Sequence, residues 1–127
     1  MLKDFPVNPT LAVTDLKRAR DFYEGKLGLA PDASMTDDMG VLYSAGGGTS
    51  LYIYSRPNAP TADNTQASFK VDDIQKSIDE LSAKGVTFEH YDMPGIKTDE
   101  KGVAVMGKVK SCWFKDPDGN ILSLLQV

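Results

Sequence analysis

The chain has 127 residues, of which 41% are hydrophobic and 25% charged, and its formal net charge is -4. These values are typical of one folded globular domain and exclude a disordered chain. The acidic balance excludes a basic surface for nucleic acid or anionic lipid, and no apolar run exceeds four residues, so we expect no contact with nucleic acid or membrane. The single cysteine, Cys112, excludes an intrachain disulfide. We expect a soluble, cytoplasmic protein.

The first half of the chain predicts a strand, a helix and three further strands. A short apolar strand over about residues 10–14 leads to an acidic helix cap, Thr14 or Asp15. The helix is expected to run to about Leu27, because apolar side chains recur in it every three or four residues. Three consecutive glycines supply the positive φ angles of a hairpin turn. The further strands are expected near residues 33–35, 39–45 and 49–55.

The second half repeats this order at an offset of 58 residues, the distance from Val13–Leu16 to the matching Val71–Ile74. Asp72 or Asp73 caps its helix, which is expected to reach about Lys84. A proline and a glycine in the sequence DPDGN predict a tight turn before the last strand. The strands of this half are expected near residues 66–71, 87–93, 103–115, with an irregularity at Gly107, and 121–126.

The two halves together predict an α+β fold of two repeated βαβββ modules in one domain, residues 1–127. Module 1 covers about 1–57 and module 2 about 65–127, joined by a polar linker at about 56–64. Each module alone has a marginal core, because it offers one apolar sheet face and one helix. We therefore expect curved antiparallel sheet with the helices on its outer face and a cleft on the other.

This arrangement resembles the vicinal oxygen chelate superfamily, which includes glyoxalase I, extradiol dioxygenases, and fosfomycin- and bleomycin-resistance proteins. The resemblance covers nearly the whole chain. It implies a divalent metal in the cleft, held by His, Gln or Glu from four strands, and a homodimer. The segments that carry the resemblance are Leu11–Leu16, Phe22–Tyr23, Leu27–Leu29, Phe69–Ile74 and Trp113–Asn120.

The metal positions that the resemblance implies carry unsuitable residues here. They fall on Asn8 or a neighbour, about Tyr52, Gln66 and Ser123, and only Gln66 is of an allowed type. A catalytic zinc or transition-metal site needs imidazole, carboxylate or thiolate ligands, usually at least three. The only histidine, His90, lies in a strand that provides no ligand in the family, and we interpret it as a partly exposed strand residue. We therefore expect no metal and no other cofactor.

Strand alternation predicts which side chains face the cleft. If Gln66 faces the cleft, Ser68 does too, because the two are separated by one residue. Tyr52 and Tyr54 share one side of their strand for the same reason. Cys112 then points into the core as an inert thiol. The aromatic residues could instead fill the core or a dimer interface. The predicted ligand-binding residues are Trp113, Tyr52, Tyr54, Gln66, Ser68, Ser111 and Ser123.

An apolar hollow with a few hydrogen-bonding groups is typical of a small-molecule site. The sequence thus favours a metal-independent protein that holds a small organic ligand by aromatic stacking and polar contacts, as bleomycin-resistance-like proteins do by sequestration. The alternative is a metal-dependent glyoxalase-like lyase or isomerase, or a dioxygenase, and only this alternative needs a divalent metal. A third possibility is an interaction domain without a ligand, in which Trp113 lies in a subunit interface.

Overall fold

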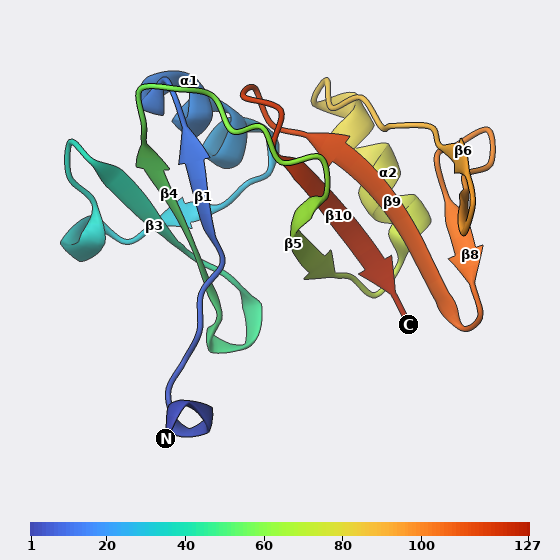
Figure 1. Cartoon of the computed structure of the whole chain (residues 1–127), viewed down its shortest axis with the longest axis horizontal. Coiled ribbons are helices and arrows are strands. Elements are labelled where there is room, and N and C mark those ends of the chain that lie inside the picture. Colours follow the sequence, from blue (N-terminus) through green and yellow to red (C-terminus); the bar gives the residue numbers. More distant parts are fainter. The chain divides into compact units, whose positions relative to one another are not determined.

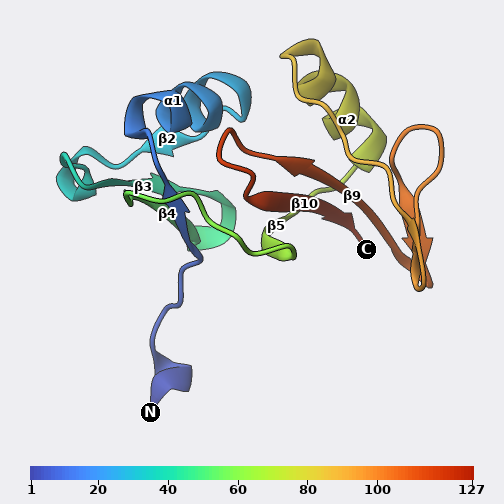
Figure 2. The same cartoon turned by 45° about the horizontal axis from the view of Figure 1, so that its top comes forward.

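Each half of the chain folds around its own four-stranded sheet, in a computed structural model that describes residues 1–127 (Figures 1 and 2). The compact units are Met1–Pro60 and Thr61–Val127, and the division falls inside the segment that the sequence predicts as a linker. No strand of one unit pairs with a strand of the other. None of the helices has both the length and the apolar composition needed to cross a bilayer. The α+β fold of two repeated modules is thereby confirmed.

The first unit forms a mixed sheet in the order β1-β4-β3-β2, in which β1 runs parallel to β4 and the other pairs are antiparallel. A helical segment covers one face of this sheet, and the residues before β1 extend away from it (Figure 1). The elements are η1 (Leu2–Asp4), β1 (Thr10–Val13), α1 (Leu16–Arg20), η2 (Asp21–Lys26), β2 (Ala30–Pro31), η3 (Ala33–Met35), β3 (Gly40–Ser44), η4 (Gly46–Gly48) and β4 (Ser50–Ser55).

The helix of the first unit begins where the sequence predicts. The Asp15 carboxylate accepts the backbone N–H of Arg18 at 3.0 Å, which satisfies one of the free amides of the first turn. The α-helix then widens into the π-helical η2, which contributes Phe22 and Tyr23 to the core. Alternate strand residues complete this core, and they are Leu11, Val13, Val41, Tyr43, Leu51 and Ile53.

The second unit repeats the plan in the order β5-β10-β9-β8, with β5 parallel to β10 and the other pairs antiparallel. Two short strands, β6 and β7, pair only with each other. Helix α2 lies on one face of the sheet (Figure 2). The elements are β5 (Thr65–Lys70), α2 (Ile74–Ala83), β6 (Asp92–Met93), β7 (Ile96–Lys97), β8 (Ala104–Met106), β9 (Val109–Lys115) and β10 (Ile121–Gln126).

Helix α2 is fixed at its start by two side chains. Asp73 accepts the backbone N–H of Lys76 at 3.1 Å, and the amide oxygen of Gln126 accepts the N–H of Ile74 at 2.8 Å. The second bond ties the helix to the last strand, because Gln126 ends β10. The buried side chains of the helix and of the strands beneath it form the core, and they are Ile74, Ile78, Cys112, Phe114, Leu122 and Leu124.

Three expected strands differ from the observed ones. Residues 33–35 form the 3-10 helix η3, because the Asp32 carboxylate accepts the N–H and the hydroxyl of Ser34 and turns the chain. Residues 87–93 contain only an isolated bridge at Phe88 and the two-residue β6. Residues 103–115 divide into β8 and β9 at a turn where Gly107 has φ 62°.

The expected antiparallel pairing also needs one correction. It holds for the later strands of each module, whereas the first strand of each module pairs parallel with the last one. A connection through a helix allows two strands to lie parallel, which a tight hairpin does not. Each sheet is therefore mixed, and one of its two inner strands, β4 or β10, lies between a parallel and an antiparallel neighbour.

The helix cap provides a test of this local folding. Asp73→Ala should lower the free energy of unfolding by about 1 kcal/mol, because the N–H of Lys76 loses its acceptor. Asp72→Ala is the matched control, since Asp72 is exposed and lies outside the cap. Urea denaturation followed by circular dichroism measures both. Equal stability of the two variants would contradict the capping role.

Candidate functional site

In the first unit, the sheet face opposite the helix carries two tyrosines side by side. Tyr52 and Tyr54 alternate on β4 with the buried Leu51 and Ile53, so their rings point away from the helical face. The two rings are nearly parallel, with 6.2 Å between their centroids and 5° between their planes. Both side chains remain partly exposed. This Tyr pair is the aromatic surface that the sequence predicts on β4.

Gly40 makes room for the Tyr pair. It lies on β3 directly opposite Tyr54, and the hydroxyl end of Tyr52 covers it. A Cβ atom at this position would overlap the Tyr52 hydroxyl and would come within 2.6 Å of the Ile53 carbonyl oxygen. The absence of a side chain at Gly40 thus allows Tyr52 to lie along the sheet.

In the second unit, three of the predicted residues form a row across neighbouring strands. Ser123 on β10 is opposite Ser68 on β5 and opposite Trp113 on β9. The Ser68 and Ser123 hydroxyls are 2.6 Å apart and hydrogen-bonded, although Ser123 is 2% exposed. The predicted alternation therefore brings these three side chains to one face of the sheet, and two of them satisfy each other.

Trp113 is buried and hydrogen-bonded, so its ring is not freely open for stacking. Its indole N–H donates to the Thr65 hydroxyl at 3.1 Å, and its ring meets the edge of Tyr91 with centroids 5.5 Å apart. The side chain is 7% exposed and packs with Ala104 and Ile121, while Tyr91 and Ile96 cover this cluster. A ligand that stacks on Trp113 must therefore displace Tyr91 or Ile96.

The remaining predicted residues differ in what their polar atoms contact. Ser111 on β9 lies two residues before Trp113, is 1% exposed, and its hydroxyl has no hydrogen-bond partner in the structure. The Gln66 amide nitrogen donates to the carbonyl and side-chain oxygens of Asn64, so it is engaged at the start of its own strand. The structure thus groups Ser111 with the row of Ser68, Ser123 and Trp113 and leaves Gln66 outside it.

The implied metal positions do not offer a suitable donor set. Asn8 is exposed ahead of β1, Ser123 is bonded to Ser68, and Gln66 is bonded to Asn64. Within neither unit do three His, Cys, Asp or Glu side chains gather around a point that a cation could occupy. Imidazole, carboxylate or thiolate ligands are what such ions require. The residues present therefore do not fit a divalent metal, and His90 is exposed, away from these positions in the chain.

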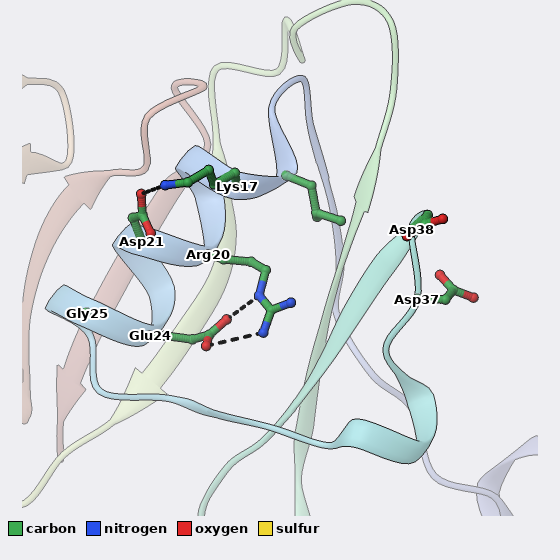
Figure 3. A pocket seen from close by; sticks show the side chains of 8 residues that line it. Lys17, Arg20, Asp21, Glu24, Gly25, Asp37 and Asp38 are labelled. Atoms are coloured by element: carbon green, nitrogen blue, oxygen red, sulfur yellow. Dashed lines mark hydrogen bonds and ion pairs between the residues drawn. The ribbon is translucent and has the colours of Figure 1, made fainter.

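Sequence reasoning missed a charged hollow of about 630 Å³ in the first unit (Figure 3). It opens between the α1–η2 helix and the turn at Asp37 and Asp38. Arg20 Nε lies 2.6 Å from a Glu24 carboxylate oxygen, and the same oxygen accepts the Tyr43 hydroxyl at 2.9 Å. The spacing of four residues between Arg20 and Glu24 was a usable signal, because such residues are neighbours on a helix surface.

This network shifts the acid–base behaviour of its members. The hydrogen bond from Arg20 lowers the pKa of Glu24, and the second bond from Tyr43 acts in the same direction. Burial, together with the bond to Glu24, raises the pKa of Tyr43. Tyr43 is 0% exposed and stacks on Tyr23 with centroids 6.0 Å apart. Glu24 lies on η2 and Tyr43 on β3. The hydrogen bond between them therefore links the helical segment to the sheet.

A second hollow, of about 420 Å³, lies in the second unit between α2 and residues 86–90. Its lining includes the polar residues Asp79, His90 and Lys101 and the apolar residues Ile78 and Phe88. Neither hollow contains a predicted ligand-binding residue. The thiol of Cys112 lies elsewhere, in the core, where burial raises its pKa to about 12, as expected of an unreactive cysteine.

Comparison with known proteins identifies the family. The model of the Glyoxalase/Bleomycin resistance protein/Dioxygenase superfamily matches residues 7–124. The chain belongs to this superfamily, as the repeated modules and the motifs from Leu11–Leu16 to Trp113–Asn120 led us to expect. No curated protein matches the sequence.

Solved structures with the same fold include proteins with different assigned functions. A glyoxalase/bleomycin resistance protein/dioxygenase from Alicyclobacillus acidocaldarius is 16% identical with a TM-score of 0.70, covering 97% of this chain and 91% of that one. TnmS3, an antibiotic-binding protein from a Streptomyces species, is 22% identical with a TM-score of 0.66, over 96% and 94% of the chains. A lactoylglutathione lyase from Agrobacterium tumefaciens is 19% identical with a TM-score of 0.67, over 96% and 92%. These likenesses establish the fold.

The Glu24 network predicts a specific acid sensitivity. Because its folded-state pKa is lowered, ionised Glu24 stabilises the fold at pH values above its ordinary pKa of 4.5. This contribution is lost as the pH falls through the lowered value. Glu24→Gln should therefore be less stable than the wild type at pH 7, and the difference should shrink as the pH approaches 3. Melting temperatures measured from pH 7 to pH 3 test this.

The matched control is Glu100→Gln, because Glu100 is exposed and has no ion pair in the structure. It should follow the wild-type melting profile across the same range. A Glu24→Gln variant that also follows that profile would show that the Arg20–Glu24 bond contributes nothing to stability.

Proposed function

We propose that the protein is a metal-independent binder of a small organic molecule, and that in each unit the sheet face opposite the helix provides ligand contacts. The observation that carries this proposal is the Tyr pair, Tyr52 and Tyr54, whose rings are nearly parallel and partly exposed, with the hydroxyl end of Tyr52 over Gly40. Exposed aromatic rings fixed on a rigid sheet give a large contact area at a small entropic cost. A fold that needed them only for its core would bury them.

The donor chemistry supports the metal-independent part of the proposal. The positions that hold a metal in the family carry a phenol, amides and a hydroxyl here, and two of these groups are already hydrogen-bonded within the second unit. Neutral donors of this kind hold zinc or a transition metal weakly. TnmS3, which has the same fold, is an antibiotic-binding protein, and this supports ligand binding as the function.

The proposed ligand contacts are the predicted ones, with the roles that the structure supports. Tyr52 and Tyr54 provide stacking surface. Ser68, Ser111 and Ser123 provide polar contacts in the second unit, and Trp113 provides apolar surface beneath Tyr91. Gln66 contributes once its bonds to Asn64 are exchanged for a ligand. We also propose that the protein is cytoplasmic and forms a homodimer. Sedimentation equilibrium of the purified chain tests the homodimer, because it gives the mass of the particle.

Binding should be measured with and without metal. The EDTA-treated protein is titrated with bleomycin and with 2-acetylnaphthalene by calorimetry, and Trp113, the only tryptophan, provides a fluorescence signal. We expect at least one probe to bind, with an affinity that added Zn²⁺ or Ni²⁺ leaves unchanged. Lactoylglutathione lyase activity that appears only with added metal would instead favour the metal-dependent enzyme. Binding of neither probe would contradict the proposal for these ligand classes.

Tyr54 is the residue with which to test the Tyr pair. Tyr54→Ala should weaken probe binding by about 1–3 kcal/mol, because a stacked ring is lost. Tyr54→Phe keeps the ring and should bind as the wild type does. Both variants should remain folded, since Tyr54 is only partly buried. Unchanged affinity in Tyr54→Ala would remove the Tyr pair from the site.

Trp113→Ala is a less selective variant than Tyr54→Ala, because it should affect both binding and folding. It should also weaken binding by about 1–3 kcal/mol. However, Trp113 is 7% exposed and bonded to Thr65, so the same truncation should lower the free energy of unfolding by about 3–5 kcal/mol. Its binding must therefore be measured well below its melting temperature, which differential scanning calorimetry determines.

A further inference from the structure

Ser111 is the one buried hydroxyl on its sheet face that lacks a partner. Ser123 bonds to Ser68, and Thr65 accepts from Trp113, so the other hydroxyls of this face take part in hydrogen bonds. Ser111 is 1% exposed, and its Oγ makes no hydrogen bond. A buried polar group without a partner destabilises a fold, and nearly all such groups in native proteins are satisfied. The Ser111 hydroxyl is therefore available to a hydrogen-bond partner from outside the chain.

The residues directly opposite Ser111 are uncharged. Its neighbours across the strands are Ala104 on β8 and Leu125 on β10, and Trp113 follows two residues later on the same face. A charged ligand group would lose its hydration here without gaining an opposite charge from these neighbours. A neutral oxygen would lose much less and would gain one hydrogen bond. The surroundings thus favour a carbonyl or ether oxygen attached to an apolar ring system.

The cover over this region is attached by side-chain packing and, two residues before Tyr91, by a backbone hydrogen bond from Glu89 N to Trp113 O at 2.8 Å. Tyr91 and Ile96 lie against the cluster of Ala104, Trp113 and Ile121. Ile96 belongs to the β6–β7 ribbon, whose strands pair only with each other. Tyr91 is tied to Thr98 at the base of the same ribbon, by bonds between Tyr91 N and Thr98 Oγ1 and between Thr98 N and Tyr91 O. The ribbon can therefore move away as a unit without breaking the hydrogen bonds of the four-stranded sheet.

We propose that Ser111 donates a hydrogen bond to the ligand and selects a neutral aromatic molecule that carries a carbonyl or ether oxygen. The inference rests on the proposed ligand-binding function and specifies its ligand class. The aromatic part of the ligand takes the place of Tyr91 and Ile96 against Trp113, and the oxygen reaches the Ser111 hydroxyl. Hydrogen bonding to the ligand then satisfies the group that the free protein leaves unsatisfied.

The first experiment needs no ligand. Ser111→Ala should raise the melting temperature of the free protein by about 2–6 °C, because it removes a buried hydroxyl without a partner. Ser123→Ala is the matched control on the same face, and it should lower the melting temperature, because it breaks the bond to Ser68. A lower melting temperature for Ser111→Ala would mean that the hydroxyl is already satisfied in the free protein, and it would overturn the proposal.

The second experiment uses two probes that differ in one oxygen. The wild type should bind 2-acetylnaphthalene about fivefold more tightly than 2-ethylnaphthalene, and Ser111→Ala should bind the two equally. Two results would overturn the role of Ser111 and leave the proposed binding function in place. One is equal binding of both probes by the wild type, and the other is a preference for the ketone that persists in Ser111→Ala. Binding of neither probe by either protein would overturn the proposed function for such aromatic ligands, and the role of Ser111 with it.

Discussion

The alternation of side chains along the central strands is the constraint on which the rest of this structure depends. In β4, Leu51 and Ile53 pack beneath the helical segment, and this forces Tyr52 and Tyr54 onto the opposite face. In β10, Leu122 and Leu124 face the helix side, and Ser123 faces away between Ser68 and Trp113. The same pattern thus supplies a core and a chemically distinct second face in each unit, and a shift of one residue would exchange them.

Much of the fold could be predicted because its signals are local. Asp15 and Asp73, as helix caps, indicate where both helices begin, and the sequence DPDGN indicates the turn of the last hairpin. The prediction of a strand at residues 33–35 was wrong because Asp32 and Ser34 form a turn through their side chains. The parallel pairing of β1 with β4 was also missed, because the partner of an edge strand is decided by contacts between distant parts of the chain.

The site could be predicted only in part, for a similar reason. Alternation placed Ser68, Ser123 and Trp113 on one face, and the structure puts them in register. Alternation contains no information about the segment that covers them, so the packing of Tyr91 on Trp113 and the bond from Trp113 to Thr65 were not foreseen. The bonds from Gln66 to Asn64 were missed because strand alternation gives the face of a side chain and not its hydrogen-bond partners. The Arg20–Glu24–Tyr43 network was missed because Tyr43 reaches it from another element.

The topology has a consequence for how such a chain can change. Because β1 pairs with β4 and β5 pairs with β10, each sheet is completed by strands of its own half, and no ladder crosses the joint between Pro60 and Thr61. An insertion or a cut in that joint leaves every sheet hydrogen bond intact. Each half can therefore acquire substitutions that its counterpart does not share. Duplication followed by such separate divergence explains how two copies of one plan come to present tyrosines on one sheet and serines on the other.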